Sequence, residues 1–353
     1  MHPLQATGEE TARYAARFPE AVANGFYRQA QEWTVSSLGI GTYLGAMDEP
    51  TSSGYREAIG EALRGGINFI DTSLNYRHQR SERDIGAAVG ALLESGKVRR
   101  EEFVVATKAG YLVPGAVPPD LVALPEVAGG MHCLAPGFLA DQLERSRANL
   151  NLETIDLFYL HNPETQLSYV SAEEFYERIR RSFAALEEMA AAGKLRYYGA
   201  ATWDGFRKQA GGGGGLSLTR LLELAEREGG PRHRFRFIQL PLNLGMAEAF
   251  QIQRETIDGE RMNVLEVAAR FGVTVVASAT LMQARLARNL PEEIAARLEG
   301  PTSDAQRAIQ FTRSTPGVTA ALVGMSRAAH VRENLEVSFF PPASREQYLR
   351  LFE

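Results

Sequence analysis

The chain has 353 residues, 44% of them hydrophobic and 23% charged, which is enough apolar material for one large α/β domain or two smaller domains. A net charge of −5 without a basic run argues against a nucleic-acid binder, and the single cysteine, Cys133, excludes an intrachain disulfide. No apolar stretch has the length of a membrane span and the N-terminus lacks the apolar core of a secretory signal, so we expect a cytoplasmic protein that binds no membrane.

In chain order, the sequence predicts an N-terminal extension over 1–24 with a short helix at 9–18, followed by a β-hairpin over 26–38. Eight short β-like runs then follow, at 40–45, 68–73, 103–109, 154–161, 196–202, 236–241, 273–279 and 319–324. Helix-like stretches separate them, at 55–65, 81–95, 136–150, 175–193, 218–228, 262–272, 303–314 and 328–337. Gly65, Gly193 and Gly272 stand where helices are expected to end in a left-handed residue. Eight strand–helix units predict one (β/α)8 barrel over the whole chain, 1–353.

Two segments interrupt this repeat. The long loop 111–136 lies between the third strand and its helix, and its Leu, Val, Tyr and Met content favours a wall of a substrate pocket over disorder. Five glycines at 211–215 predict a flexible loop, and they lack the strand–Gly–helix context of a phosphate cradle. The chain also has no GxGxxG motif, which counts against a Rossmann dehydrogenase.

Ionisable residues stand at the C-terminal edges of three successive β-like runs. Asp71, Lys108 and His161 occupy these positions, and Tyr76 follows Asp71 by five residues. Parallel α/β proteins carry their chemistry at this rim, so the four side chains predict a site there. Each also has a structural alternative: a packing tyrosine, a snorkelling lysine, a turn-capping aspartate or a turn histidine. The other five histidines show no metal-ligand spacing, so no metal site is predicted.

With Thr72, Ser81 and Glu82, this pattern resembles the aldo-keto reductases, from about residue 38 to about residue 337, although Arg77 stands where that family usually has Gly. The resemblance implies a barrel whose bottom is closed by the hairpin, with Asp71, Tyr76, Lys108 and His161 as the catalytic set. Tyr76 would act as general acid on an aldehyde or ketone, and Lys108 would lower its pKa. Asp71 would keep the lysine charged, and His161 would donate a hydrogen bond to the substrate oxygen.

The resemblance also implies NADP(H) as cofactor. Near the nicotinamide, Thr202 offers part of the capacity of the family's Asn, Gln239 matches an amide-binding residue, and Ser278 replaces the usual stacking aromatic. Trp203 and Tyr111 are the candidates to replace that ring. In the eighth unit, the resemblance implies a phosphate-binding turn formed by Gly324, Met325 and Ser326. It further implies that Arg327 and Arg332 pair with a 2′-phosphate, and that Glu333 and Asn334 contact the adenine. Without the resemblance, this unit is an ordinary barrel helix with a solvated Arg/Glu face.

The first hypothesis is therefore an NADP(H)-dependent oxidoreductase that reduces a small aldehyde or ketone to an alcohol. Its pocket walls are expected from the 111–136 loop, Trp203, Tyr43 and Leu44. The second hypothesis is a non-redox lyase or epimerase on the same barrel, because Ala201 replaces the family's Ser and the stacking aromatic is missing. The third is a cofactor-sensing subunit like those of potassium channels. The sequence does not specify the substrate, the reaction direction, the role of residues 1–24 or the oligomeric state.

Overall fold

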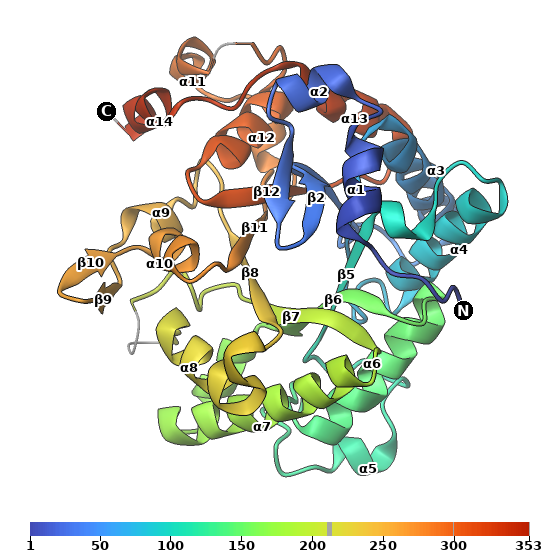
Figure 1. The fold of residues 1–353 in the computed structure, drawn as a ribbon, viewed down its shortest axis with the longest axis vertical. Coiled ribbons are helices and arrows are strands. Elements are labelled where there is room, and N and C mark those ends of the chain that lie inside the picture. The colour runs from blue at the N-terminus through green and yellow to red at the C-terminus, as the bar shows by residue number, and fades with distance from the viewer. Residues whose placement is uncertain (210–213, 299, 353) are drawn as a thin grey trace.

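A computed structural model describes residues 1–209, 214–298 and 300–352, and a closed barrel of eight parallel strands forms its centre (Figure 1). Around the barrel the strands follow the order β11-β12-β3-β4-β5-β6-β7-β8, so consecutive strands of the repeat are neighbours. Their bounds are β3 Leu38–Gly41, β4 Phe69–Asp71, β5 Val104–Ala109, β6 Ile155–His161, β7 Leu195–Ala201, β8 Phe235–Pro241, β11 Thr274–Ser278 and β12 Val318–Gly324. The predicted (β/α)8 barrel is confirmed, and each predicted β-like run overlaps one barrel strand.

The main helices surround this barrel, as Figure 1 shows. Their bounds are α3 Glu49–Gly65, α4 Arg80–Glu94, α6 Pro136–Leu150, α7 Ala172–Ala191, α8 Leu218–Gly229, α10 Val264–Arg270, α12 Asp304–Ser314 and α13 Ala328–Leu335. Side-chain caps start several of them: Asp48 accepts the backbone N–H of Thr51, and Ser303 forms a capping box with Gln306. The left-handed residue that ends α3 is Gly66, with φ 113°, so the prediction of Gly65 was wrong by one residue. Gly193 and Gly272 do have positive φ, as predicted.

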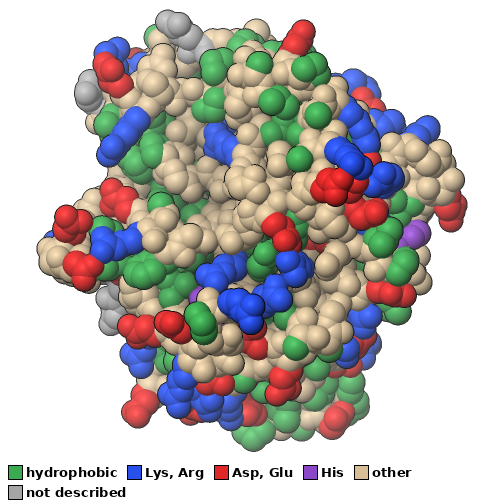
Figure 2. Space-filling view, in the orientation of Figure 1, with side chains coloured by type: hydrophobic (Ala, Val, Ile, Leu, Met, Phe, Trp, Pro, Cys, Tyr) green, Lys and Arg blue, Asp and Glu red, His purple; other side chains and the backbone are tan. Residues whose placement is uncertain are grey.

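The N-terminal residues lie across the bottom of the barrel, in front in Figure 1. Helices α1, Gly8–Ala15, and α2, Pro19–Ala23, precede the antiparallel hairpin of β1, Tyr27–Ala30, and β2, Trp33–Ser36. Trp33 is fully buried, donates its indole N–H to the carbonyl of Ala6 at 3.1 Å and packs 5.8 Å from the ring of Phe237. The hairpin therefore closes this end of the barrel, as predicted. Figure 2 shows Lys and Arg beside Asp and Glu around the rim and in the lower middle of the same face.

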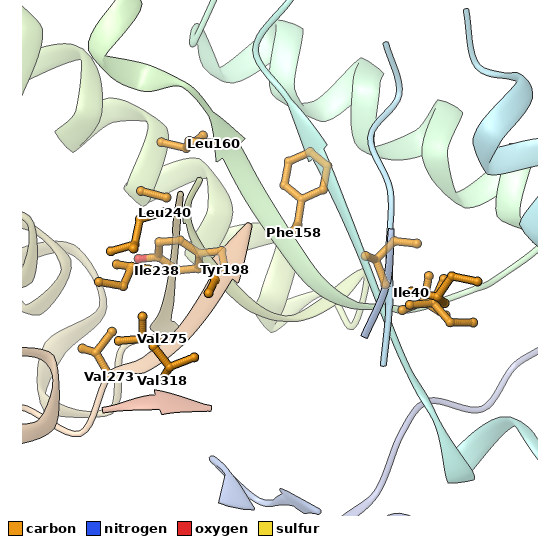
Figure 3. Close-up of a cluster of buried hydrophobic side chains, with 14 of the residues drawn as sticks. Ile40, Phe158, Leu160, Tyr198, Ile238, Leu240, Val273, Val275 and Val318 are labelled. Atoms are coloured by element: carbon orange, nitrogen blue, oxygen red, sulfur yellow. The ribbon is translucent and has the colours of Figure 1, made fainter. Parts of the chain in front are cut away.

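Alternation along the barrel strands separates two hydrophobic layers. Phe158 and Leu160 of β6 belong to the layer between the barrel and its helices, part of which Figure 3 shows. Leu157 and Tyr159 belong instead to the cluster inside the barrel. Because side chains alternate along a strand, His161 shares the inner face of Leu157 and Tyr159. The same alternation therefore turns the polar residues at the strand ends toward the barrel axis.

The connecting loops contain shorter helices and strands that were not predicted from the sequence. They are α5 Pro119–Val122, α9 Glu248–Gln251, β9 Glu255–Ile257, β10 Glu260–Met262, α11 Glu292–Arg297 and α14 Arg345–Leu349, with 3-10 turns at Arg100–Glu102, Pro163–Ser168, Gly230–Arg232, Arg285–Ala287, Glu336–Phe339 and Arg350–Phe352. Of the predicted glycine loop 211–215, residues 211–213 lie outside the described residues. No helix among the described residues is both long and apolar enough to cross a membrane.

Candidate active site

Strands β4, β5 and β6 each deliver one predicted residue to the same rim of the barrel. Asp71 is the last residue of β4, His161 is the last of β6, and Lys108 is the penultimate residue of β5. Asp71 follows Phe69, and Lys108 follows Val104 and Ala106, which all belong to the inner barrel cluster. Period-two alternation therefore turns the three polar side chains inward at the C-terminal rim.

Lys108 and Asp71 form a buried ion pair at the base of the site. Lys108 Nζ lies 2.5 Å from Asp71 Oδ1 and also donates to the carbonyl of Thr72 at 2.7 Å. Gln239 of β8 donates from Nε2 to Asp71 Oδ2 at 2.8 Å, so both carboxylate oxygens are hydrogen-bonded. Burial raises the pKa of Asp71 and lowers the pKa of Lys108, while the attraction between the two opposes both shifts. The pairing expected from the sequence is present.

Tyr76 lies on the turn after β4, with its ring beside both Lys108 and His161. Lys108 Nζ is 5.1 Å from the ring centroid, and the His161 ring meets it edge-on with centroids 5.8 Å apart. Burial, followed by the negative charge of Asp71, raises the pKa of Tyr76 well above its ordinary value. The predicted lowering of this pKa by Lys108 is therefore wrong for this structure, because the lysine is already paired with Asp71. Tyr76 is a protonated phenol here.

Arg77, the departure from the family pattern, occupies a left-handed backbone position with φ 48°. A glycine adopts this conformation without cost, whereas arginine has to be held there by its surroundings. Its buried guanidinium donates to Asp84 Oδ2 at 2.7 Å, to Ser52 Oγ at 2.9 Å and to the carbonyl of Ala46 at 2.9 Å. These contacts fasten the turn that carries Tyr76 to its neighbouring segments.

His161 is held through both its ring and its backbone. Its Nδ1 lies 3.0 Å from Ser73 Oγ, and its carbonyl accepts a hydrogen bond of 2.8 Å from Nε2 of His132. The ring of Tyr111 meets the imidazole edge-on, with centroids 5.2 Å apart. Burial and the nearby Lys108 lower the pKa of His161 well below its ordinary value. The imidazole is therefore neutral at neutral pH and carries one ring hydrogen.

A cavity of about 600 Å³ opens above these residues. Asp71, Tyr76 and His161 line it, together with the predicted wall residues Tyr43, Leu44, Tyr111 and Trp203. In the loop 111–136, Tyr111 is the cavity-lining residue, while Val113 and Ala116 pack against Leu74. The cavity size is typical of a site for a small molecule.

The predicted cofactor residues divide into two groups. Thr202, Gln239, Ser278 and Gly324 line the cavity, as does Arg285, which the sequence did not indicate. The Thr202 hydroxyl is buried without a hydrogen-bond partner in the described part of the chain, and so is the hydroxyl of Thr280, another lining residue. A buried polar atom without a partner is expected to receive one from a ligand or water.

The second group lies in the eighth unit, outside the cavity lining. Met325 points into the core, Arg332 pairs with Glu61 of α3 at 3.1 Å, and Glu333 accepts from Ser303 at 2.9 Å. The Asn334 side chain is buried, Arg327, the N-cap of α13, is exposed, and Ser326 is half-buried. Among the described residues Arg327 has no carboxylate partner, whereas Arg332 is paired with Glu61. Roles for this group stay predictions.

Several residues around the site were not singled out in the sequence. Glu164 accepts the backbone N–H groups of Trp203, Asp204 and Gly205 at 2.7, 3.0 and 3.2 Å, which fixes the loop after β7. His132 lies within the long loop, and Ser73 lies between Thr72 and Tyr76. Of these residues, only Ser73 could have been recognised in the sequence, because it lies inside the motif that carries Asp71 and Tyr76. Glu164 and His132 could not, because their contacts join segments that are far apart in the sequence. Within the described ranges, no three His, Cys, Asp or Glu side chains group as metal ligands.

Comparison with known proteins agrees with this architecture. The model of the "Aldo/keto reductase family" matches residues 37–208. The chain is 29% identical over 182 residues to the "NADH-specific methylglyoxal reductase" of Escherichia coli, covering 48% of this chain and 49% of that protein. It is 30% identical over 132 residues to the "6-dehydroglucose reductase" of Novosphingobium aromaticivorans, covering 37% and 38%. The alignments with these curated relatives thus span about half of their length or less.

Solved structures match over nearly the whole chain. The glycerol dehydrogenase of Gluconobacter oxydans gives a TM-score of 0.66 at 20% identity, covering 93% of this chain and 94% of that one. The aldo/keto reductase of Klebsiella pneumoniae in complex with NADP and acetate gives 0.63 at 18% identity, covering 91% and 92%. The fold and rim define a (β/α)8 barrel protein with its polar site at the carboxyl ends of the strands. Residues 37–208, just under half of the chain, match the aldo/keto reductase family, and the fold of nearly the whole chain is similar to that of solved aldo-keto reductases.

Proposed function

We propose that the protein is an NADP(H)-dependent oxidoreductase that reduces an aldehyde or ketone carbonyl to an alcohol, with Tyr76 as general acid. The observation that carries this proposal is the meeting of Tyr76, His161 and the Lys108–Asp71 pair at the base of one cavity. The curated relatives named above are reductases, which supports a redox activity over a lyase or epimerase.

The cavity suits a nicotinamide cofactor, which supplies the hydride when bound. Thr202 and Thr280 offer buried hydroxyls that have no partner among the described residues, and Gln239, whose Nε2 donates to Asp71, also lines the cavity. These groups can hold a carboxamide, which needs both donors and acceptors. Trp203 lines the cavity and is half exposed, and it would cover the nicotinamide ring in place of the aromatic side chain that Ser278 replaces. Tyr111 fits that role less well, since its ring packs on His161 and its hydroxyl accepts from Asn162 at 3.0 Å.

The chain's own groups provide the proton and the hold on the substrate oxygen. In the described part of the chain the Tyr76 hydroxyl has no hydrogen-bond partner, and its raised pKa keeps the proton on it until an acceptor arrives. A carbonyl oxygen that gains negative charge is such an acceptor. His161 is neutral and donates a hydrogen bond to the same oxygen through its free ring nitrogen. Lys108 Nζ, paired with Asp71, lies 5.1 Å from the centroid of the Tyr76 ring, so the ion pair forms the base of the site beneath the proton donor.

The preference for NADP(H) over NAD(H) rests on Arg327. Its guanidinium is exposed at the start of α13, where it can pair with a 2′-phosphate. A solved structure of a K. pneumoniae neighbour holds NADP, whereas the E. coli relative is named NADH-specific. The substrate would be a small-molecule carbonyl or alcohol bound against Tyr43, Leu44 and Trp203. We also propose a cytoplasmic location, which the single buried Cys133 supports.

The proposal is tested by titrating the purified protein with NADPH and with NADH, followed by fluorescence, and then by screening aldehydes and ketones with the tighter cofactor. Micromolar or tighter binding with NADPH preferred, together with carbonyl-dependent oxidation of NADPH, is the expected result. Binding of neither cofactor would refute the reductase and point to non-redox acid–base chemistry. Co-purification with a membrane channel would instead favour the sensing subunit.

A further inference from the structure

Ser73 lies directly after β4, fully buried, with its hydroxyl facing three polar groups. Its Oγ lies 3.0 Å from Nδ1 of His161, 2.6 Å from Oδ1 of Asn75 and 3.1 Å from the carbonyl oxygen of Lys108. A hydroxyl has one hydrogen to donate and two lone pairs that accept. The group that accepts the Ser73 hydrogen therefore determines which of the other groups must donate a hydrogen bond to Ser73 Oγ.

Two proton arrangements satisfy these contacts. The Lys108 carbonyl already accepts the backbone N–H of Leu74 at 3.2 Å, so it does not need the Ser73 hydrogen. The Asn75 amide can present either its oxygen or its NH2 group, because the two look alike in heavy-atom geometry. If it presents NH2, Asn75 donates to Ser73, Ser73 donates to His161 Nδ1, and the ring hydrogen sits on Nε2. If it presents oxygen, Asn75 takes the Ser73 hydrogen, and Nδ1 has to carry the ring hydrogen instead.

The choice between these arrangements matters because His161 is neutral and has only one ring hydrogen. His161 lines the cavity, and Ser73 engages its Nδ1, so Nε2 is the ring nitrogen left for a ligand. A carbonyl oxygen only accepts hydrogen bonds. With a bare Nε2, His161 would place a lone pair against that oxygen and repel it.

We propose that Ser73 is a positioning residue that sets the tautomer of His161. Its hydroxyl donates to Nδ1 and thereby keeps the ring hydrogen on Nε2, where a carbonyl needs a donor. Asn75, which also lines the cavity, completes the chain by donating its amide hydrogen to Ser73 Oγ. The consequence for rate rests on the proposed carbonyl reduction, whereas the tautomer itself does not.

The tautomer can be measured in the full chain with ¹⁵N-labelled histidine by long-range ¹H–¹⁵N correlation, which separates protonated from unprotonated ring nitrogens. The His161 signals are assigned by their loss in His161→Gln. His132 is an internal reference, because its Nε2 must carry hydrogen to donate to the His161 carbonyl. The wild type should show hydrogen on Nε2 of His161, and Ser73→Ala should move the signals toward hydrogen on Nδ1. Hydrogen on Nδ1 in the wild type, or an unchanged pattern in Ser73→Ala, would overturn the proposal.

A pair of charge-matched variants separates the hydrogen-bond chain from a general field effect. Asn75→Asp replaces the amide with a group that only accepts, so it draws the Ser73 hydrogen and should move the His161 hydrogen to Nδ1. Asn162→Asp adds the same charge to the same cavity, but its side chain contacts Tyr111 rather than Ser73. It should keep the wild-type tautomer. The same tautomer in both variants would refute the role of the chain through Asn75 and Ser73.

Kinetics give the functional readout. Ser73→Ala should lower kcat/KM for carbonyl reduction by about tenfold, the usual effect of losing one buried hydrogen bond, while the Kd for NADPH is unchanged. Ser73→Thr retains the hydroxyl and should recover most of that loss. Wild-type kinetics in Ser73→Ala would contradict the positioning role. A wild type that binds NADPH and reduces no carbonyl would refute the proposed function instead, and the tautomer measurement would still judge Ser73.

Discussion

Acid should weaken the folded protein through His132, the buried residue that attaches the loop 111–136 to the backbone of His161. Its Nε2 donates to the His161 carbonyl at 2.8 Å, and its Nδ1 lies 3.0 Å from Nε2 of Gln166, which donates to it. Both ring nitrogens are used, and one of them accepts, so the ring has to be neutral. Burial lowers the pKa of His132 to about 4, from 6.5 for an ordinary histidine.

The size of this effect follows from linkage between protonation and folding. The unfolded chain binds a proton at His132 below about pH 6.5 and the folded chain only below about pH 4, so stability is lost as the pH falls through this window. The difference of about 2.5 units between the pKa of His132 in the unfolded and folded chains corresponds to a loss of folding stability of about 3.4 kcal/mol, at about 1.36 kcal/mol per pKa unit. At about pH 5 the loss is about 2 kcal/mol, and above about pH 7 it is negligible.

Urea unfolding at about pH 7 and about pH 5 measures this loss in the wild type and in His132→Gln. Glutamine can still donate toward the His161 carbonyl but does not titrate, so the stability difference between the two proteins should shrink by about 2 kcal/mol on acidification. His330→Gln, at an exposed position of α13, is the control and should leave the pH dependence as in the wild type. An equal pH dependence in wild type and His132→Gln would show that His132 is not the buried neutral group described here.

Three further predictions concern the site. Arg327→Ala should weaken NADPH binding more than NADH binding in a fluorescence titration; equal losses would remove the basis for NADP(H). Asp71→Asn leaves Lys108 buried without its counter-ion and should cost about 3–5 kcal/mol in chemical unfolding, with much of this regained in Asp71→Asn/Lys108→Met; no recovery in the double variant would contradict the pairing. Because the pKa of Tyr76 is raised and that of His161 is lowered, kcat/KM for reduction should stay flat from about pH 7 to about pH 9; a fall within this range would show a phenol with a lowered pKa.

The barrel could be predicted from sequence because its signals are local. Each buried strand is a short apolar run, and each helix has its own periodicity and caps, as Ser303 and Gln306 show for α12. The hairpin of β9 and β10 was missed because its strands are polar, although Asp258 and Gly259, both with positive φ, form the Asp-Gly turn that signals a hairpin.

The site was only partly predictable, because its chemistry depends on contacts between distant segments. The positions of Asp71, Tyr76, Lys108 and His161 follow from strand ends and from the family pattern. The ionisation of Tyr76 does not, since it depends on how deeply the phenol is buried and on Lys108 being paired with Asp71. Which arginine of the eighth unit stays free is equally invisible in sequence, because Glu61, the partner of Arg332, lies on α3.

The most direct test of the central claim is the reduction of an aldehyde substrate by Tyr76→Phe, measured in a single turnover with saturating NADPH. The substitution removes only the phenolic oxygen, so NADPH should bind with the wild-type Kd while the rate of reduction falls by about 10²- to 10⁴-fold, the usual contribution of a general acid. An unchanged rate in Tyr76→Phe would contradict the assignment of Tyr76 as the proton donor and, with it, the mechanism proposed here.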